Sequence, residues 1–414
     1  MKYFRIYSYL KLLFFFKSFF FKAKNLESQI KKYITNNSGK KFFVLTSQLR
    51  SGFFILLKFL IKKNPKKNEI ILSPFNLAEM VNIPRNLKLK IIFPKLKDNL
   101  FIDSHEVKKK INNKTLAVLC TNFFNTTKDL IELKRICTEF KVPLIEDNAI
   151  YFDNFKEIKK KRIYSGSFGD YSLYSFNIMK NISAMYGGGV STNDRGFIEY
   201  ANLQISDFKN FFLTKFLNQC FVYLILKIIS INFIYNLLFF KLIRRAHNNN
   251  NNFLIKKIYP SLKFKKENIS RIYKTKIRNS SIKMIYLQLK DNKNRKINHR
   301  VRKLNNFYYE KCFLEKSIKR IKIIKIKEED FQNYNDYPIF VKKKKKLVKY
   351  LFSKGIETKV ISYKDCQNLF GIKKKYLKPY EDRIICLPNH KKITKSYINY
   401  IVNSIHQFYY KKKI

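Results

Sequence analysis

Short apolar runs alternate with segments of helical period along most of the chain. Apolar runs lie at residues 42–46, 70–72, 116–121 and 142–145, and stretches with a helical spacing of apolar residues follow at 51–61, 77–83 and 128–140. Continuous apolar strands separated by helices are typical of a sheet that is covered on both faces. The pattern therefore predicts an α/β domain with a mostly parallel sheet over residues 41–259.

The last third of the chain has a different order of elements. A helical pattern covers residues 276–315, strand-like runs follow at 321–326, 337–341 and 384–387, and further helical segments lie at 343–354 and 394–409. We expect a smaller C-terminal α+β domain over residues 260–414. Its boundary lies near Pro260, after a connection made of the five asparagines at 248–252.

Two segments are too apolar for ordinary surface elements. Residues 1–40 form a basic, aromatic leader that lacks a small-residue cleavage site, so we expect an amphipathic helix there rather than a signal peptide. In the insertion at 211–243 polar residues recur every three or four positions and share one side of a helix. Lys227 near its centre would cost about 3 kcal/mol in a membrane span. Peripheral membrane contact and protein contact stay open as alternatives.

The net charge does not indicate a nucleic-acid-binding protein. The 414 residues include 86 Lys and Arg against 29 Asp and Glu, a formal net charge of +57. The excess is spread over the whole chain together with many Ile, Asn and Phe, which favours a compositional bias over a dedicated basic face. With no aromatic ribonucleoprotein motif and no paired Cys/His spacing, we expect no specific nucleic acid and no metal. Six scattered cysteines predict free thiols in the cytoplasm.

An acid, a hydroxyl, a lysine and glycines follow one another between residues 146 and 189, as a cofactor with an aldehyde requires. Lysine becomes a nucleophile when burial lowers its pKa, and Lys180 lies between the strand-like run ending near Ser175 and three glycines. Asp147 ends an apolar run, where α/β sheets place ligands, and could pair with a protonated ring nitrogen. The alternatives are a helix N-cap for Asp147 and a solvated side chain for Lys180. Together they point to pyridoxal phosphate (PLP).

A phosphate site is expected where the first strand leads into a helix. Ser51 and Gly52 open that helix, so their amides should point outward at its N-terminus. Arg50 and the hydroxyls of Ser51 and Ser175 would add charge and hydrogen bonds. Capping of the helix by Ser51 alone is the alternative interpretation.

Several motifs resemble those of one enzyme family. They are Val-Pro-Leu-Ile-Glu-Asp-Asn-Ala at 142–149, Gly-Ser-Phe-Gly-Asp at 166–170, Ser-Leu-Tyr-Ser-Phe at 172–176, Lys-Asn at 180–181 and Gly-Gly-Gly-Val-Ser-Thr-Asn-Asp at 187–194. This set is similar to the DegT/DnrJ/StrS family of PLP-dependent nucleotide-sugar aminotransferases, which have the fold-type I architecture. The resemblance runs from about residue 41 to the C-terminus.

The resemblance implies a role for each candidate residue. Lys180 would bind PLP covalently and move the proton, Asp147 would pair with the pyridine nitrogen, and Ser175 would contact the phosphate. The positions of the family's phosphate-binding turn and of its frequent histidine are occupied by Arg50, Ser51 and Asn122. The implied activity is amino transfer, expected from glutamate, to a nucleotide-linked ketosugar for polysaccharide or glycan biosynthesis. The implied assembly is a homodimer that completes the active site.

The chain departs from the family pattern at three places. Ile150 replaces a common histidine or glutamine, Leu77 replaces a ring-stacking aromatic residue, and residues 273–276 lack the asparagine that a neighbouring subunit lends to the phosphate. Related dehydratases carry histidine at the lysine position, so Lys180 favours transamination. The departures keep a second interpretation open, in which an eroded PLP-fold protein acts as a membrane-associated binding or scaffold protein.

Overall fold

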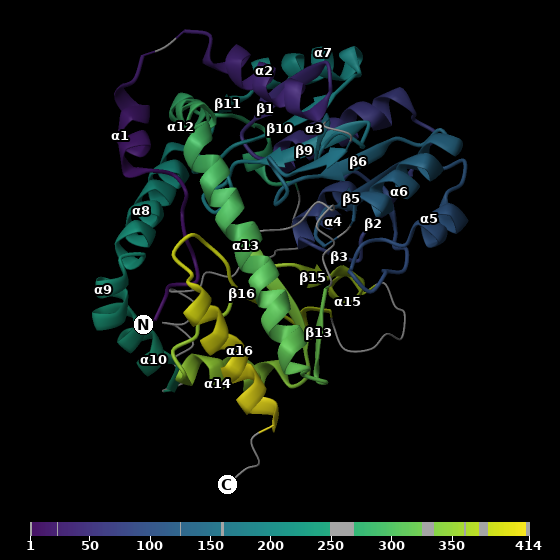
Figure 1. The fold of residues 1–414 in the computed structure, drawn as a ribbon. Coiled ribbons are helices and arrows are strands. Elements are labelled where there is room, and N and C mark those ends of the chain that lie inside the picture. The colour runs from purple at the N-terminus through teal and green to yellow at the C-terminus, as the bar shows by residue number, and fades with distance from the viewer. Residues whose placement is uncertain are drawn as a thin grey trace.

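The centre of the fold is a seven-stranded sheet with helices on both faces (Figure 1). The computed structural model describes residues 2–22, 24–124, 126–158, 161–248, 269–324, 335–359, 362–371 and 380–410. In spatial order the strands are β1 (Phe42–Thr46), β10 (Gly188–Thr192), β9 (Tyr171–Ser175), β6 (Leu144–Asp147), β5 (Thr115–Thr121), β2 (Glu69–Leu72) and β4 (Lys90–Ile92). Within this sheet β10 alone runs antiparallel to its neighbours, so the expected mostly parallel α/β sheet is confirmed.

Alternate side chains of each strand face two different helical layers. Ile70 and Leu72 of β2 pack with one layer and Ile71 packs with the other. The first layer is α3 (Leu49–Lys63), α4 (Ala78–Asn86) and α7 (Arg195–Ser206); the second is α2 (Leu26–Ser38), α5 (Ser104–Lys110), α6 (Thr127–Glu139) and α12 (Asn279–Lys290). A strand that is buried on both faces has to be apolar at successive positions, which explains the unbroken apolar runs in the sequence.

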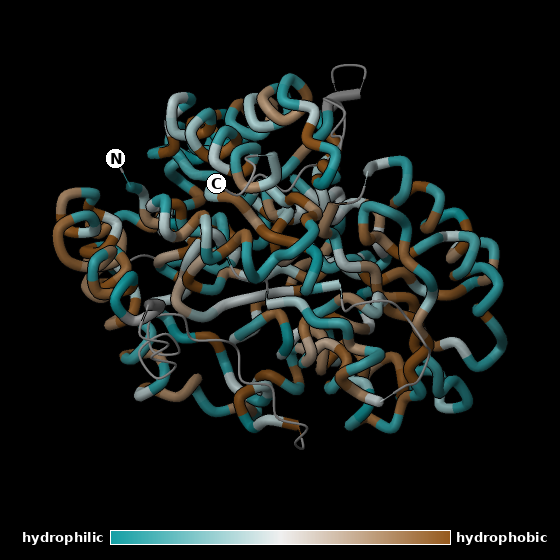
Figure 2. Tube along the Cα trace, turned by 90° about the horizontal axis from the view of Figure 1, so that it is seen from below, coloured by the Kyte–Doolittle hydropathy of each residue, from teal (hydrophilic) through white to brown (hydrophobic). Residues whose placement is uncertain are grey.

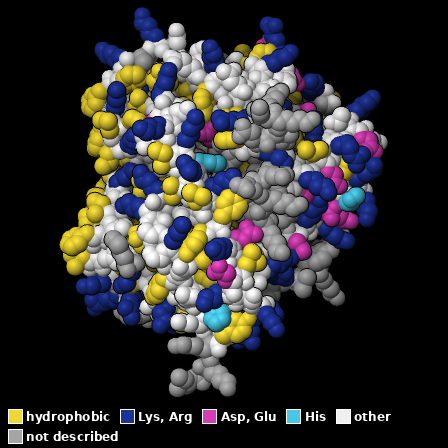
Figure 3. All heavy atoms as spheres, viewed as in Figure 1, with side chains coloured by type: hydrophobic (Ala, Val, Ile, Leu, Met, Phe, Trp, Pro, Cys, Tyr) yellow, Lys and Arg dark blue, Asp and Glu magenta, His cyan; other side chains and the backbone are white. Residues whose placement is uncertain are grey.

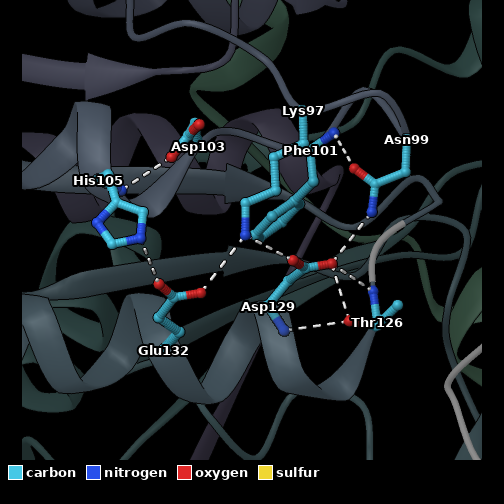
Figure 4. A network of polar contacts seen from close by, with 8 residues as sticks. All are labelled: Lys97, Asn99, Phe101, Asp103, His105, Thr126, Asp129 and Glu132. Atoms are coloured by element: carbon cyan, nitrogen blue, oxygen red, sulfur yellow. Dashed lines mark hydrogen bonds and ion pairs between the residues drawn. The ribbon is translucent and has the colours of Figure 1, made fainter.

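A polar network fixes the start of α6, the helix that leads into β6 (Figure 4). Thr126 and Asp129 form a capping box, in which the Asp129 amide donates to Thr126 Oγ1 at 3.2 Å and the Thr126 amide donates to Asp129 Oδ2 at 2.9 Å. Lys97 Nζ lies 2.9 Å from Asp129 Oδ1 and 3.4 Å from Glu132 Oε2. Burial opposes ionisation of Asp129, but these hydrogen bonds outweigh it and lower the pKa of its carboxyl group.

The C-terminal part packs around a three-stranded antiparallel sheet, as an α+β unit should. Its strands are β13 (Ile321–Ile323), β14 (Asp336–Val341) and β16 (Ile384–Pro388), and its helices are α13 (Asn292–Lys316), α14 (Lys344–Ser353) and α16 (Lys395–Tyr410). The helical stretch expected over 276–315 consists of two helices, since α12 ends at Lys290 and α13 begins at Asn292. Pro260, the asparagines at 249–252 and residues 325–326 lie outside the described residues, so the division into domains stays a prediction.

Short elements connect these parts. Three two-stranded pairs join β3 (Phe75–Asn76) to β15 (Lys364–Asp365), β7 (Phe155–Ile158) to β8 (Lys161–Tyr164), and β11 (Lys209–Asn210) to β12 (Thr275–Lys276). Further short elements are a helix, α15 (Cys366–Leu369), and two 3₁₀ turns, η2 (Arg271–Tyr273) and η3 (Tyr380–Asp382). The β3–β15 pair bonds the C-terminal part directly to a loop at the edge of the large sheet.

The leader does not form the single amphipathic helix that its composition predicts. Residues 2–10 form neither helix nor strand, and they run against the C-terminal part of the chain. The Arg5 guanidinium donates to the carbonyl of Thr358 at 2.9 Å and pairs with the Glu357 carboxylate at 3.6 Å. Phe4 is buried there as well. These long-range partners explain why the leader is not helical before α1 (Leu12–Phe20).

The apolar insertion at 211–243 is not one continuous helix either. It contains α8 (Leu213–Ile229), α9 (Asn232–Ile234), a π-helical turn η1 (Tyr235–Phe239) and the start of α10 (Phe240–Asn248). The direction of the chain changes by 83° between α8 and the helical stretch at 232–245. None of the helices in the described ranges has by itself the length and apolar composition of a membrane span, whereas this bent pair together passes that test.

Candidate active site

The candidate residues gather at one edge of the large sheet. Asp147 is the last residue of β6, Ser175 is the last residue of β9, and Asn122 directly follows β5. These three strands are parallel neighbours, so their carboxyl ends lie at the same edge. Ligands of open α/β sheets bind at this edge, because strand ends and loops leave side chains free there.

Asp147 is a buried acid with few partners in its own chain. Its side chain is 3% exposed, and its Oδ1 accepts the Ala149 amide at 2.9 Å. Burial raises the pKa of the Asp147 carboxyl group to about 6, while the Ala149 amide and the Lys180 ammonium oppose that rise. The N-cap alternative is excluded, because no helix begins after Asp147 in the described residues up to 158.

Lys180 lies in a turn that the neighbouring backbone holds in place. Its amide donates to the carbonyl of Asn177 at 3.0 Å, and the Ser183 hydroxyl lies 2.9 Å from the carbonyls of both Lys180 and Ile178. The side-chain amide of Gln288 on α12 accepts the Ser183 amide at 3.1 Å and donates to the Ser183 carbonyl at 2.7 Å. The position of the lysine is therefore set from outside the turn as well as within it.

The environment of Lys180 makes its ammonium group easier to deprotonate than that of an ordinary lysine. Burial lowers the pKa of the Lys180 ammonium from its ordinary value of 10.5 to about 8. Asp147 opposes this fall, and the positive charge of Lys359 adds to it. Asp147 and Lys180 each shift the other's pKa toward the charged form, so they lie within electrostatic reach of one another. The structure thus brings together the amine and the acid that the sequence predicted.

An ion pair that the sequence analysis did not predict borders this site. Lys359 Nζ lies 2.6 Å from Asp336 Oδ2, and both residues influence the charge of Lys180. Burial disfavours the Lys359 ammonium, but Asp336 outweighs burial and raises the pKa of Lys359. Nothing in the local sequence marks this pair, because its members are 23 residues apart and lie more than 150 residues beyond Lys180.

The expected phosphate turn differs in one respect from the prediction. Helix α3 begins at Leu49, two residues before Ser51, so Ser51 and Gly52 do not open it. Their amides donate to the carbonyl of Gln48 at 3.1 and 3.2 Å and do not point outward. The error arose because Gln48, rather than Ser51, has the extended backbone of the N-cap residue. The first-turn amides at this helix end are those of Leu49 and Arg50.

The side chains of that turn are arranged as a polar cluster. Ser51 Oγ lies 2.9 Å from Ser47 Oγ, and Ser47 Oγ accepts the Thr275 hydroxyl at 2.9 Å. Arg50 binds Gln48 Oε1 at 2.9 Å and Glu79 Oε1 at 3.2 Å. Arg50 is close enough to lower the pKa of Lys180, so this cluster and the amine belong to one region.

Gly188 explains how Ser175 comes near the start of α3. Gly188 of β10 pairs with Ser175 on one side and with Thr46 of β1 on the other. A Cβ atom on Gly188 would lie 2.2 Å from the amide nitrogen of Leu49. Only glycine allows the first turn of α3 to approach the sheet this closely.

Asn122 and Glu146 form the support behind Asp147. The Glu146 carboxylate accepts Asn122 Nδ2 at 2.8 Å and the amides of Gly166, Phe168 and Gly169 at 2.8, 3.2 and 3.0 Å. Glu146 is therefore an anchor of the loop at 166–169. Asn122 Nδ2 also donates to Asn148 Oδ1, whereas Asn122 Oδ1 is buried and has no hydrogen-bond partner among the described residues.

The two atypical positions lie in apolar surroundings. Ile150 and Leu77 are partly buried and pack against a cluster that contains Phe75, Phe123 and Tyr363. The ring centroid of Phe123 lies 5.5 Å from that of Phe75 and 4.5 Å from that of Tyr363. The charge of Asp147 contributes to the raised pKa of Tyr363, so aromatic rings adjoin the acid although Leu77 is aliphatic.

The described residues contain neither a cluster of metal ligands nor a disulfide. No group of three or more His, Cys, Asp or Glu side chains is placed there to hold a metal ion. All six cysteines are buried and free. The functional groups that the described residues place at this edge of the sheet are therefore an amine, carboxylates, hydroxyls and an amide.

This arrangement occurs on the fold of the PLP-dependent sugar aminotransferases. The Helicobacter pylori aminotransferase PseC, involved in the biosynthesis of pseudoaminic acid, superposes with a TM-score of 0.71 over 100% of both chains at 17% identity. A sugar aminotransferase of Streptococcus pneumoniae in its PLP-form gives 0.67, over 99% of this chain and 98% of that one, at 13% identity. Similarity at this level of identity concerns the fold.

Sequence comparison points to the same family. Residues 18–210 match the model of the DegT/DnrJ/EryC1/StrS aminotransferase family, which confirms the resemblance indicated by the motifs. GDP-perosamine synthase of Vibrio cholerae is 32% identical over 127 residues, which are 30% of this chain and 34% of that protein. The chain matches less than half the length of the curated relatives compared with it.

Proposed function

We propose that this protein is a PLP-dependent aminotransferase that transfers an amino group from an amino acid to a keto nucleotide-sugar. The observation that carries the proposal is that Lys180, with its lowered pKa, lies within electrostatic reach of the buried Asp147 at the carboxyl edge of the sheet. The family match over residues 18–210 and the fold support it. Glutamate as the donor, and a role in polysaccharide or glycan biosynthesis, are finer parts of the same proposal.

The residues present fit PLP. A buried carboxylate with one hydrogen bond from its own chain suits a protonated ring nitrogen, and a partly buried amine suits an aldehyde. The buried Asn122 Oδ1 still lacks a donor among the described residues. Ser175, Arg50 and the hydroxyl of Ser51 would hold the phosphate. When bound, PLP supplies an electron-withdrawing ring that stabilises negative charge on the donor carbon.

The protein's own contribution is control of protons and charge. With a pKa of about 8, Lys180 has a substantial neutral fraction near neutral pH and can accept and return a proton at Nζ. Asp147, with a pKa of about 6, remains mostly ionised at the same pH. Ile150, Leu77 and the neighbouring aromatic rings exclude water around the acid, which strengthens its electrostatic interactions.

The decisive experiment uses the purified full-length protein and added PLP. We expect a near-visible absorbance band, and a borohydride-trapped adduct that maps to Lys180. A Lys180→Arg variant should lose both, while Lys311→Arg, at an exposed position of α13, should keep both. A wild-type protein that stays colourless and forms no adduct contradicts the proposal and supports the eroded binding protein instead.

Substrate identity needs a second measurement. Glutamate should abolish the absorbance band faster than alanine or aspartate does, with release of 2-oxoglutarate. A panel of keto nucleotide-sugars should then restore the band, with formation of an amino sugar. An adduct at Lys180 without any amino-sugar product would retain the cofactor assignment and exclude the substrate assignment.

Assembly and location complete the proposal. We infer a homodimer from the family resemblance alone, and light scattering on the purified protein tests it. The six buried, free cysteines support a reducing, cytoplasmic location. Fractionation of cells that express a tagged protein would contradict this location if the protein were recovered from a compartment other than the cytoplasm and the membranes that border it.

A further inference from the structure

Helix α8 exposes a stripe of large apolar side chains. Leu213, Leu217, Phe221 and Ile228 are spaced at helical intervals and are 52%, 51%, 62% and 49% exposed. Residues four or seven apart lie on the same face of a helix, so these side chains form one outward stripe. A helix covering an ordinary soluble protein has the opposite orientation.

Two polar residues in the C-terminal half of α8 face the protein, whereas Thr214, Lys215 and Asn218 near its start are exposed. Tyr223 is fully buried, and its hydroxyl donates to the carbonyl of Leu10 at 3.0 Å. Lys227 Nζ donates to the carbonyl of Ser8 at 2.9 Å and lies over the ring of Tyr7. Burial lowers the pKa of Lys227 to about 8. The leader therefore covers these two polar side chains and leaves the apolar stripe outward.

Helix α1 and the segment after the bend extend this surface. The ring of Phe15 on α1 lies 4.7 Å from that of Tyr223, so α1 packs beside α8. Figure 1 places α1, α8, α9 and α10 along one side of the molecule, and Figure 3 shows hydrophobic side chains gathered along that side. Figure 2 shows the same concentration of apolar residues in these helices. We call the exposed apolar residues of α1 and of residues 212–242 the apolar flank: Leu12, Leu13, Phe16, Phe19, Phe20, Phe212, Leu213, Leu217, Phe221, Ile228, Ile231, Phe233, Leu237, Leu238 and Leu242.

The exposed large hydrophobic residues are concentrated on the apolar flank rather than scattered over the surface. It holds 15 of the 24 large hydrophobic residues that are exposed in the described part of the chain. Phe20 and Phe233 are 82% and 74% exposed. Contiguous exposed apolar surface of this kind marks a contact with another molecule or with a membrane.

The charges on the segments that carry the apolar flank are all of one sign. The sequence has no Asp or Glu at positions 1–26 or 208–266. Exposed basic residues lie on the same elements: Lys17, Lys22, Lys215, Lys241, Arg244 and Arg245. A second copy placed against this face through a two-fold axis would bring like charges together, whereas an anionic lipid surface complements them.

The packing of α8 against the folded domain favours a helix that lies on the membrane surface over one that crosses the membrane. Phe216, Cys220 and Tyr223 of α8 are buried against the same core as α12 of the folded domain. The other side alone is free for lipid, and the chain turns by 83° at the end of α8. Such a one-sided apolar surface with basic residues is typical of a helix that lies in the membrane interface.

We propose that the apolar flank docks this protein peripherally onto a membrane that contains anionic lipids, with α1, α8 and the helices after the bend lying in the interface. This inference does not depend on the proposed activity. It goes beyond the expectation of a membrane-contacting insertion, because the leader helix forms part of the same surface.

The absence of tryptophan from the sequence provides a direct test. Phe221→Trp places a single fluorophore on the apolar flank, and Leu203→Trp places one at a comparably exposed site on α7, 64% against 62%. With vesicles of phosphatidylcholine and phosphatidylserine, we expect a blue shift and quenching by brominated lipid for the first variant and neither for the second. Vesicles of phosphatidylcholine alone, or high salt, should weaken the response.

A loss-of-binding series tests the same surface without a probe. Phe221→Gln combined with Phe233→Gln should weaken co-sedimentation with anionic vesicles by about tenfold or more, because two large apolar side chains no longer enter the interface. Leu203→Gln combined with Leu304→Gln, also exposed, should bind as the wild type does. Unchanged thermal unfolding confirms that both variants fold.

Three results would overturn the proposal. The first is a wild-type protein that does not bind anionic vesicles, and the second is equal binding by the two double variants. The third is a wild-type dimer that becomes monomeric in the Phe221/Phe233 variant while vesicle binding is absent, because that result assigns the apolar flank to a second copy. Formation of the PLP adduct at Lys180 is measured separately, so failure of one proposal leaves the other testable.

Discussion

The pKa of Lys180 gives the sharpest prediction, and pH is the perturbation. Burial lowers this pKa from 10.5 to about 8. At pH 7 about 9% of Lys180 would be neutral, against about 0.03% for a lysine at its ordinary value, a difference of about 300-fold. Because only the neutral amine attacks an aldehyde, Lys180 should react far faster than other lysines near neutral pH.

The assay is reductive methylation of the cofactor-free protein with formaldehyde and cyanoborohydride, followed by mass spectrometry of the peptides. Labelling of Lys180 should rise between pH 7 and pH 9, with a midpoint near 8. Lys359 is the matched control, since it borders the same site but Asp336 holds its pKa above the ordinary value. The exposed Lys311 reports the pH dependence of the reagent.

Two outcomes would refute this reasoning. A midpoint for Lys180 near 10.5 would show that burial does not control the amine. Equal labelling of Lys359 and Lys180 at pH 8 would show that the Asp336 ion pair does not distinguish them. Either result removes the physical basis for choosing Lys180 as the nucleophile.

Three further changes test the neighbourhood of the site. Asp147→Asn should move the Lys180 labelling midpoint below 8 and weaken PLP retention, because the lost carboxylate stabilises the ammonium. Glu146→Gln should lower the free energy of unfolding by about 3 kcal/mol in urea titrations, because backbone amides of the loop after β8 lose a charged acceptor. Asp129→Asn should cost about 1–2 kcal/mol at neutral pH and progressively less in acid.

Each of these three predictions has a result that would contradict it. A higher Lys180 midpoint in Asp147→Asn would mean that the two groups do not interact as described. Glu199→Gln removes an exposed carboxylate and should change stability by less than about 0.5 kcal/mol, so an equal effect at Glu146 would exclude the anchoring role. The lowered pKa of Asp129 stabilises the fold above pH 3.8, and that contribution is lost as the pH falls; a pH-independent difference would contradict it.

The periodicity of the sequence predicted the large sheet well because burial on both faces leaves a local signal. The strands expected at 42–46, 70–72 and 116–121 lie within one residue of β1, β2 and β5. Helix ends were less well predicted. The start of α3 was placed two residues late, because extended backbone at Gln48 rather than a favoured capping side chain ends the preceding turn.

The candidate site was predictable in part. Asp147 and Ser175 lie at one edge because the strand ends of a parallel sheet meet there, and Lys180 follows β9 by five residues. Lys359 and Asp336 were not predictable, since they reach the site from the C-terminal part of the chain through tertiary packing.

The sequence by itself determined the α/β class, the order of acid, hydroxyl, lysine and glycines, and the amphipathic character of α8. Only the tertiary structure decided how far the pKa of Lys180 is lowered, because desolvation depends on groups that pack around the side chain from distant segments. It also decided which side of α8 is covered. Helical period divides polar from apolar residues, but the leader's carbonyl groups accept Tyr223 and Lys227, and this contact leaves the apolar side outward.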